Sequence, residues 1–328
     1  MRPKIVSAGK WLIPLVLLFT YPSLVNYDSF FLHTMIYFLF FMILGAGLNL
    51  LMTTGQLSIG HAAFMGIGAY TCVILVTRHG WSFWLAWAAC GVLSGVMAFL
   101  LGRLTLRIKG VFFAILTFAF GEIIRMIFVN VKYFGGVNGI SGIPVPNSIN
   151  LGFLQFSFAS KAEFYYLVLV FSLICMIMYF RLVGSQVGIV LKSINGTDLL
   201  AQCCGIDIMK YKVFAFVLGA VWAGMVGGLY APYFTYISPH SFTFVESVDF
   251  IIISVVGGVG ALSGPLFGSL FLIAVPEVFR FAKEYELIIY ALSLIAVLFF
   301  LPRGIGGVME MKMRAVRREV PGGPKPRA

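Results

Sequence analysis

The sequence predicts an all-α polytopic membrane protein. Three observations support this fold class: 60% of the 328 residues are hydrophobic, only 11% are charged, and the mean hydropathy is +0.99. A soluble domain could not cover so much apolar surface, whereas helices that cross a bilayer expose it to lipid. The apolar residues also fall in runs near the ~20-residue length that spans a bilayer, separated by short basic segments.

These runs predict about ten transmembrane helices, some of them short or broken. The first run resembles a signal peptide, but no small-residue cleavage site follows it, so we retain it as a span. The last three runs are shorter than the rest. The expected spans cover residues 11–26, 33–52, 58–77, 83–101, 111–131, 163–181, 211–233, 246–259, 263–281 and 286–301.

Basic residues predict that the N- and C-termini are both cytoplasmic, because Lys and Arg are enriched in cytoplasmic loops. A single span over residues 248–281 would place the basic C-terminal tail outside, so the glycine-rich break at 257–265 is expected to divide this region into two spans. Residues 1–307 then form the transmembrane domain, and residues 308–328 form a basic cytoplasmic tail. Residues 133–160 form one long outer loop.

Residues 184–211 form the longest soluble-looking helical segment between spans. Apolar residues recur on one helical face there, and Asn195-Gly196 is a turn signal, so a helix-turn-helix is expected at the cytoplasmic side. Either another protein binds this segment or it is an ordinary interfacial helix. The outer loop 133–160 has the composition of ordered turns, which either bind an external partner or cap helix ends.

Two glycine-rich segments, at residues 54–68 and 257–268, interrupt apolar spans. Broken helices inside a membrane are common along solute pathways, although close packing of small residues is the alternative explanation. Polar side chains beside the first break favour a pathway. The candidate pathway residues are Asn49, Gln56, Ser58, His61, Gly257, Gly258 and Gly260.

Small residues recur every fourth position in the span 211–233, which predicts close helix–helix contact. They are Gly219, Ala220, Ala223, Gly224, Gly227 and Gly228. In the span 111–131, Glu122 and Arg125 are three residues apart and can form an intramembrane ion pair on one helix face. This pair either contacts a solute or neutralises itself near the outer end of the span.

Several classes of function are disfavoured. The five cysteines are odd in number and do not suggest a disulfide framework, and the four histidines lack metal-ligand spacing, so no metal and no cofactor are expected. The net charge of +11 fits cytoplasmic loops and contact with membrane lipid rather than nucleic acid. No phosphate-binding glycine loop is present, because Gly9-Lys10 is followed by Trp11, so any ATP must act through a partner.

Motifs in order over residues 40–307 resemble the LivM-type permease subunits of bacterial branched-chain amino-acid ABC importers. They include the runs GLNL from Gly47 and GEIIR from Gly121. The matching stretches are residues 47–70, 106–110, 118–125, 135–144, 205–208, 211–216, 223–230, 257–268 and 301–304.

The resemblance implies a permease domain over residues 1–307 in the bacterial inner membrane, with 133–160 as a periplasmic loop and 184–211 as the segment that couples to the ATPase. It implies four kinds of partner: a LivH-like second permease, most simply in a heterodimer, two LivG/LivF-like ATPase subunits, a periplasmic binding protein and membrane lipid. The chain itself is then a transporter subunit, not an enzyme. The coupling residues are Lys192, Asp198, Ala201 and Gly205, although Asn195 and Gly196 stand where the family usually has a charged pair.

The function expected from this resemblance is a membrane path for leucine, isoleucine and valine. Related permeases suggest urea, short amides or other small carboxylates as alternatives. An ion-coupled secondary transporter is a further alternative, which requires buried carboxylates or a cation site. A membrane enzyme is disfavoured, because no nucleophile, base and metal set converges in the sequence.

Overall fold

The computed structural model describes residues 9–108, 110–150, 155–156, 158, 160–196 and 202–319. These residues are almost entirely helical, which confirms the predicted all-α class. The helices are α1 (Gly9–Leu24), α2 (Ser29–Met52), α3 (His61–Thr77), α4 (Phe83–Thr105), α5 (Val111–Asn130), α6 (Lys161–Val183), α7 (Gln186–Gly196), α9 (Ile208–Phe234), α10 (Phe244–Gly257), α11 (Gly264–Phe279), α12 (Glu286–Phe300) and α13 (Gly304–Glu319). The shorter elements are the 3-10 turns η1 (Lys132–Phe134), η2 (Gly136–Asn138), η3 (Pro239–Phe242) and η4 (Arg280–Tyr285) and the strands β1 (Ile140–Ser141), β2 (Ile149–Asn150), β3 (Gln155–Phe156) and β4 (Tyr236–Ile237).

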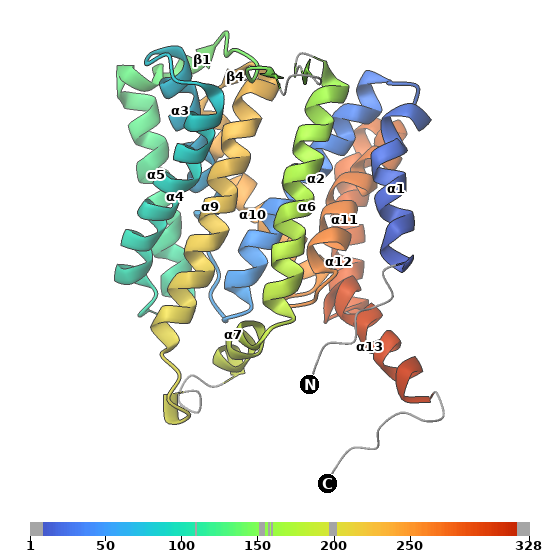
Figure 1. Ribbon diagram of the computed structural model, residues 1–328. Coiled ribbons are helices and arrows are strands. Elements are labelled where there is room, and N and C mark those ends of the chain that lie inside the picture. Colours follow the sequence, from blue (N-terminus) through green and yellow to red (C-terminus); the bar gives the residue numbers. More distant parts are fainter. Residues whose placement is uncertain are drawn as a thin grey trace.

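The apolar helices run between two ends of the molecule (Figure 1). In the described chain these are α1–α6 and α9–α12, ten in number, and seven helical stretches are long and apolar enough to cross a membrane by themselves. Helix α3 has only 17 residues, because the break before His61 replaces its first turns. About ten spans, some short or broken, are thereby confirmed. Helices α7 and α13 share one end of the molecule, and that this end is cytoplasmic stays a prediction.

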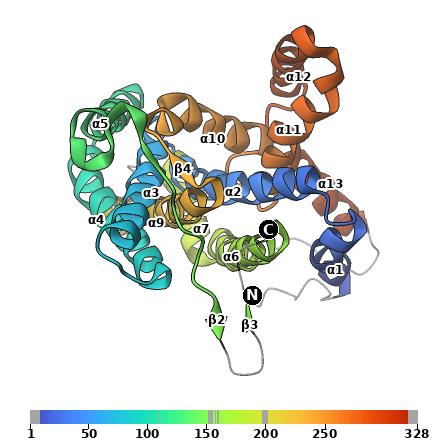
Figure 2. The same cartoon turned by 90° about the horizontal axis from the view of Figure 1, so that it is seen from above.

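Helix α2 forms the centre of the bundle. Seen from above, it lies between α10 and α11 on one side and α6 and α9 on the other (Figure 2). Leu39 and Leu48, which lie on opposite faces of α2, are each at most 1% exposed. A helix that is apolar on every face can be enclosed in this way by neighbours on all sides.

The small residues of α9 allow its neighbours to approach closely, as the sequence predicts. A Cβ on Gly219 would lie 2.6 Å from the carbonyl oxygen of Gly47 in α2. A Cβ on Gly227 would lie 2.0 Å from the carbonyl oxygen of Met65 in α3. Contacts this short cannot form, so any larger side chain must push the helices apart. The predicted close packing of this span is confirmed.

The loop after α5 is tied to the segment after α9 at the end opposite α7. Strand β1 pairs antiparallel with β4, with Ile140 opposite Ile237. Gly135 and Gly139 have φ of +86° and +69°, which favour glycine in the tight turns that lead into β1. The described part of this loop contains ordered turns, as predicted, whereas its binding of an external partner stays a prediction.

We expect Gly227→Ala to destabilise the protein, because the added methyl meets the backbone of α3 rather than a side chain that could move. Overpacking of this kind costs about 1–3 kcal/mol. The measurement is the thermal unfolding midpoint of the purified protein in detergent. Ala88→Val is the control, because Ala88 is exposed on the surface of α4. Equal midpoints for the two variants would contradict the close contact between α9 and α3.

Candidate translocation and coupling site

The second glycine break separates α10 from α11 and reverses the chain at the end of the molecule where α7 lies. Gly258 and Gly260 have φ of +104° and +70°, conformations that side chains with a Cβ rarely adopt. Both residues are buried. The turn therefore leaves backbone N–H and C=O groups inside the protein without helical partners, and these groups need other hydrogen bonds.

Asn49 of α2 supplies those hydrogen bonds. Its side chain is fully buried, and its Nδ2 donates to the carbonyl oxygen of Gly258 at 3.2 Å. The backbone N–H of Gly260 donates to Asn49 Oδ1 at 2.9 Å. The Tyr179 hydroxyl of α6 lies 3.1 Å from Asn49 Oδ1 and 2.9 Å from the Ala261 carbonyl oxygen, and can donate its single proton to either. One amide thus joins α2, α6 and the second break.

Helix α13 covers the same break from the end of the bundle. The Glu310 carboxylate accepts a hydrogen bond from the Leu262 N–H. A Cβ on Gly304 would lie 2.4 Å from the Gly258 nitrogen, and Gly304 has φ of +71°, so only glycine fits this approach. The proposed boundary at residues 307 and 308 falls inside α13, and a separate tail stays a prediction.

The first break, between α2 and α3, has unpaired polar atoms instead. Gln56, Ser58 and His61 are at most 2% exposed. Among the described residues, Gln56 Oε1, Ser58 Oγ and both ring nitrogens of His61 have no hydrogen-bond partner, although the His61 ring faces the Gly219 carbonyl. Buried polar atoms are nearly always paired with protein or water. This group therefore has an unused capacity to bind water or a small polar solute.

Neighbouring helices hold the backbone around the first break. The Ile59 N–H donates to Thr117 Oγ1 of α5 at 3.1 Å. The Ala62 N–H, in the first turn of α3, donates to Ser247 Oγ of α10 at 2.9 Å. The start of α3 is therefore fixed by α5 and α10, which approach it from outside the α2–α9 core.

Glu122 and Arg125 form the predicted ion pair on α5. Arg125 Nη2 lies 2.7 Å from Glu122 Oε2, and the side chains are 19% and 28% exposed. Glu122 also lines a small recess with Gly60 and Ser247, so the pair lies beside the start of α3 rather than at the outer end of α5. The structure thereby brings the ion pair and the first break together.

Helix α7 lies against both breaks. Its buried face includes Leu191 and Ile194, at 1% and 2% exposure, which agrees with the predicted one-sided helix. A Cβ on Gly260 would lie 3.1 Å from Lys192 Cε, and a Cβ on Gly55 would lie 2.8 Å from Asn195 Oδ1. Lys192 and Asn195 are three positions apart and neighbours on the surface of this short helix. Lys192 therefore lies against the second break, and Asn195 lies against the first.

Of the remaining coupling candidates, one lies among the described residues. Gly205 has φ of +78° and is exposed, with open space around it. Asp198 and Ala201, together with the start of the expected second short helix, lie outside the described residues. The role of these three residues in coupling stays a prediction.

Sequence reasoning missed two carboxylates, Glu246 and Asp249 of α10. They line a cavity of about 630 Å³ between α2, α10, α11 and α12, together with Tyr37 and Tyr290. The sequence contains a signal for them, because two acidic residues three positions apart in the first turns of an apolar helix are unusual within a membrane.

Ten apolar helices in the described chain, two helix breaks close to α2 and an amphipathic helix against both breaks are the features expected of a polytopic membrane protein of the transport-permease class. The chain belongs to the family described as branched-chain amino acid transport system / permease component, whose model matches residues 30–298. This confirms the resemblance found in the sequence.

Individual relatives agree with this family. The chain is 30% identical over 311 residues to the high-affinity branched-chain amino acid transport system permease protein LivM of Salmonella typhimurium strain LT2, covering 89% of this chain and 73% of the relative. The same figures apply to LivM of Escherichia coli K12. A probable LivH permease of Methanocaldococcus jannaschii is 31% identical over 180 residues, 50% of this chain and 54% of the relative. No solved structure matches.

We expect Asn49→Ala to lower the thermal unfolding midpoint, because it leaves the Gly260 N–H buried without its partner. The Gly258 carbonyl loses one hydrogen bond but keeps the one that the Ala261 N–H donates. Each unsatisfied group costs roughly 1–3 kcal/mol. Tyr179→Phe, which removes one hydroxyl, should have a smaller effect. The matched control is Asn130→Ala, because Asn130 is an exposed residue whose Nδ2 donates to the Met126 carbonyl within α5. A loss for Asn49→Ala no larger than for this control would contradict the role of Asn49.

Proposed function

We propose that this chain is the membrane-spanning permease subunit of an ATP-driven ABC importer for leucine, isoleucine and valine. The observation that supports this most strongly is the match to the branched-chain amino acid permease family over residues 30–298. The names of the LivM relatives add the substrate class. The polar atoms of Gln56, Ser58 and His61 that have no partner among the described residues could hydrogen-bond a small polar solute once the first break opens.

The partners follow from this class. A periplasmic binding protein delivers the amino acid, and a LivH-like permease completes the path as a heterodimer with this chain in the bacterial inner membrane. Two LivG/LivF-like ATPase subunits bind the cytoplasmic segment 184–211 and hydrolyse ATP. The similarity to a probable LivH permease indicates that the two permeases share an ancestry, which suits a pseudo-symmetric pair.

The contacts of α7 suggest how the ATPase acts on this chain. When the ATPase subunits close, they move α7, whose Lys192 and Asn195 lie against Gly260 and Gly55. The second break is hydrogen-bonded to α2 through Asn49, so movement of α7 reaches the centre of the bundle through one rigid turn. The start of α3 then shifts against α5 and α10, and the buried polar group of the first break gains access to the path.

A second candidate is an ion-coupled secondary transporter. Glu246 and Asp249, half-buried in one cavity, are the intramembrane carboxylates that such a mechanism needs. Glu122 is less suited, because Arg125 neutralises it. The family match favours the ABC importer over this candidate.

We expect radiolabelled leucine uptake by proteoliposomes that contain the chain, its partner permease and the ATPase subunits to require both ATP and the binding protein. Isoleucine and valine should compete with leucine for uptake. If urea, short amides or unrelated small carboxylates compete instead, the substrate is one of these compounds rather than a branched-chain amino acid. Uptake driven by an ion gradient in vesicles without the ATPase subunits would favour the secondary transporter.

A pair of variants separates binding of the ATPase from the transmission of its movement to the membrane helices. We expect Asp198→Lys to abolish co-purification of the ATPase, because a reversed charge in the coupling segment disrupts the binding surface. Gly260→Ala should retain the ATPase but lower leucine uptake about tenfold, a change of roughly 1.4 kcal/mol, since its methyl lies against Lys192 and Thr53.

The control for this pair is Gly142→Ala. Gly142 has φ of +73°, close to the +70° of Gly260, but open space surrounds it. Both substitutions therefore impose similar backbone strain, and only one touches α7. Equal uptake by the two alanine variants would exclude transmission through the contact between Lys192 and Gly260.

A further inference from the structure

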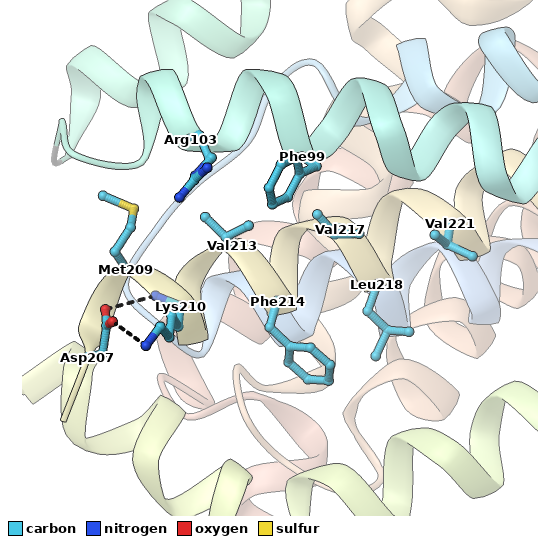
Figure 3. A pocket seen from close by; sticks show the side chains of 10 residues that line it. All are labelled: Phe99, Arg103, Asp207, Met209, Lys210, Val213, Phe214, Val217, Leu218 and Val221. Atoms are coloured by element: carbon cyan, nitrogen blue, oxygen red, sulfur yellow. Dashed lines mark hydrogen bonds and ion pairs between the residues drawn. The ribbon is translucent and has the colours of Figure 1, made fainter.

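An open groove lies between α4 and α9 (Figure 3). These two helices lie on the side of the bundle away from α10 and α12 (Figure 2). Its volume is about 460 Å³. The walls are apolar: they are formed by Phe99 of α4 and by Val213, Phe214, Val217, Leu218 and Val221 of α9. Phe214 is 43% exposed, although most of α9 is buried. The groove therefore lies where the neighbouring helices do not cover α9.

Charged side chains gather at one end of the groove only. Arg103 lies there, its guanidinium 5.3 Å from the centroid of the Phe99 ring, and it has no acidic partner among the described residues. Lys210 Nζ lies 3.1 Å from Asp207 Oδ2, and the Lys210 side chain is 81% exposed. Figure 3 shows these groups together at the start of α9.

The mouth of the groove has a net charge of +1, from Arg103, Lys210 and Asp207. Hydrogen bonds from Lys210 lower the pKa of Asp207, so this carboxylate is ionised at neutral pH and supplies the one negative charge in this sum. A phosphodiester headgroup has a charge of −1 and matches this balance. The unpaired guanidinium is the group that can donate two parallel hydrogen bonds to phosphate oxygens.

The length of the groove matches one leaflet of a bilayer. Lys210 and Val221 are 11 positions apart on α9, or about 17 Å at 1.5 Å per residue. Half of a bilayer hydrocarbon core is about 15 Å. The apolar walls start beside the charged mouth and continue toward the middle of the bundle, so a chain that fills them would end near the bilayer midplane.

We propose that this groove binds one anionic phospholipid of the cytoplasmic leaflet, with its phosphate at Arg103 and Lys210 and an acyl chain along Val213, Val217 and Val221. The lipid fills the space between α4 and α9 just after the coupling segment 184–211. It therefore braces the first turns of α9, through which α7 is joined to the core. The inference rests on the membrane orientation in the proposed function and not on the transported solute.

The test is native mass spectrometry of the full-length chain, titrated separately with phosphatidylglycerol and phosphatidylcholine. We expect the wild type to bind about one phosphatidylglycerol more tightly than phosphatidylcholine. Arg103→Gln should weaken this binding about fivefold, which corresponds to the loss of one interfacial charge. Arg107→Gln is the matched control, because Arg107 is an exposed neighbour that does not line the groove.

Val217→Phe tests the apolar part independently, because its ring fills the groove and should abolish the tightly bound lipid without changing any charge. Thermal midpoints close to that of the wild type identify variants that remain folded. Equal affinity of the wild type for the two lipids, or equal losses in Arg103→Gln and Arg107→Gln, would overturn the proposal. So would a cross-link from a cysteine at position 217 to the partner permease, because the groove would then be a protein interface.

Discussion

Backbone groups inside a membrane must find hydrogen bonds within the protein, and the Asn49 side chain meets this requirement at the centre of the bundle. The chain turns at Gly258 and Gly260 because α10 and α11 are two short spans rather than one long one. That turn exposes a carbonyl and an N–H to the interior, and Asn49 pairs with both. Without this amide, the Gly260 N–H would lose its partner, and the Gly258 carbonyl would keep only the hydrogen bond from the Ala261 N–H.

The two breaks are alike in sequence but differ in their chemistry. At the second break, Asn49, Tyr179 and Glu310 pair with the chain, so it behaves as a rigid joint. At the first break, the side chains of Ser58 and His61 are buried without partners, although Thr117 and Ser247 hold the backbone. A rigid part and an unsatisfied part therefore both lie near the C-terminal end of α2, and α7 contacts both.

Close packing makes this arrangement transmit movement. Where Gly219 lies on Gly47, and Gly227 on Met65, backbones touch without intervening side chains. Such interfaces cannot deform gradually, so a displaced α7 shifts whole helices. Where packing ends, at the groove between α4 and α9, lipid is the natural neighbour. The same helix thus has one face fixed by glycine contacts and one face open to the membrane.

The sequence by itself determined the class of the protein, the breaks, the one-sided helix α7 and the ion pair of Glu122 with Arg125, because hydropathy, glycine content and residue spacing are local properties. It also pointed to Asn49 through the family motif, but not to what the residue does. Only the tertiary structure decided that Asn49 pairs with Gly258 and Gly260, more than 200 positions away, that Lys192 meets Gly260, and that Glu246 and Asp249 share a cavity. Such contacts depend on which helix faces pack together, and spacing along one helix contains no information about the other.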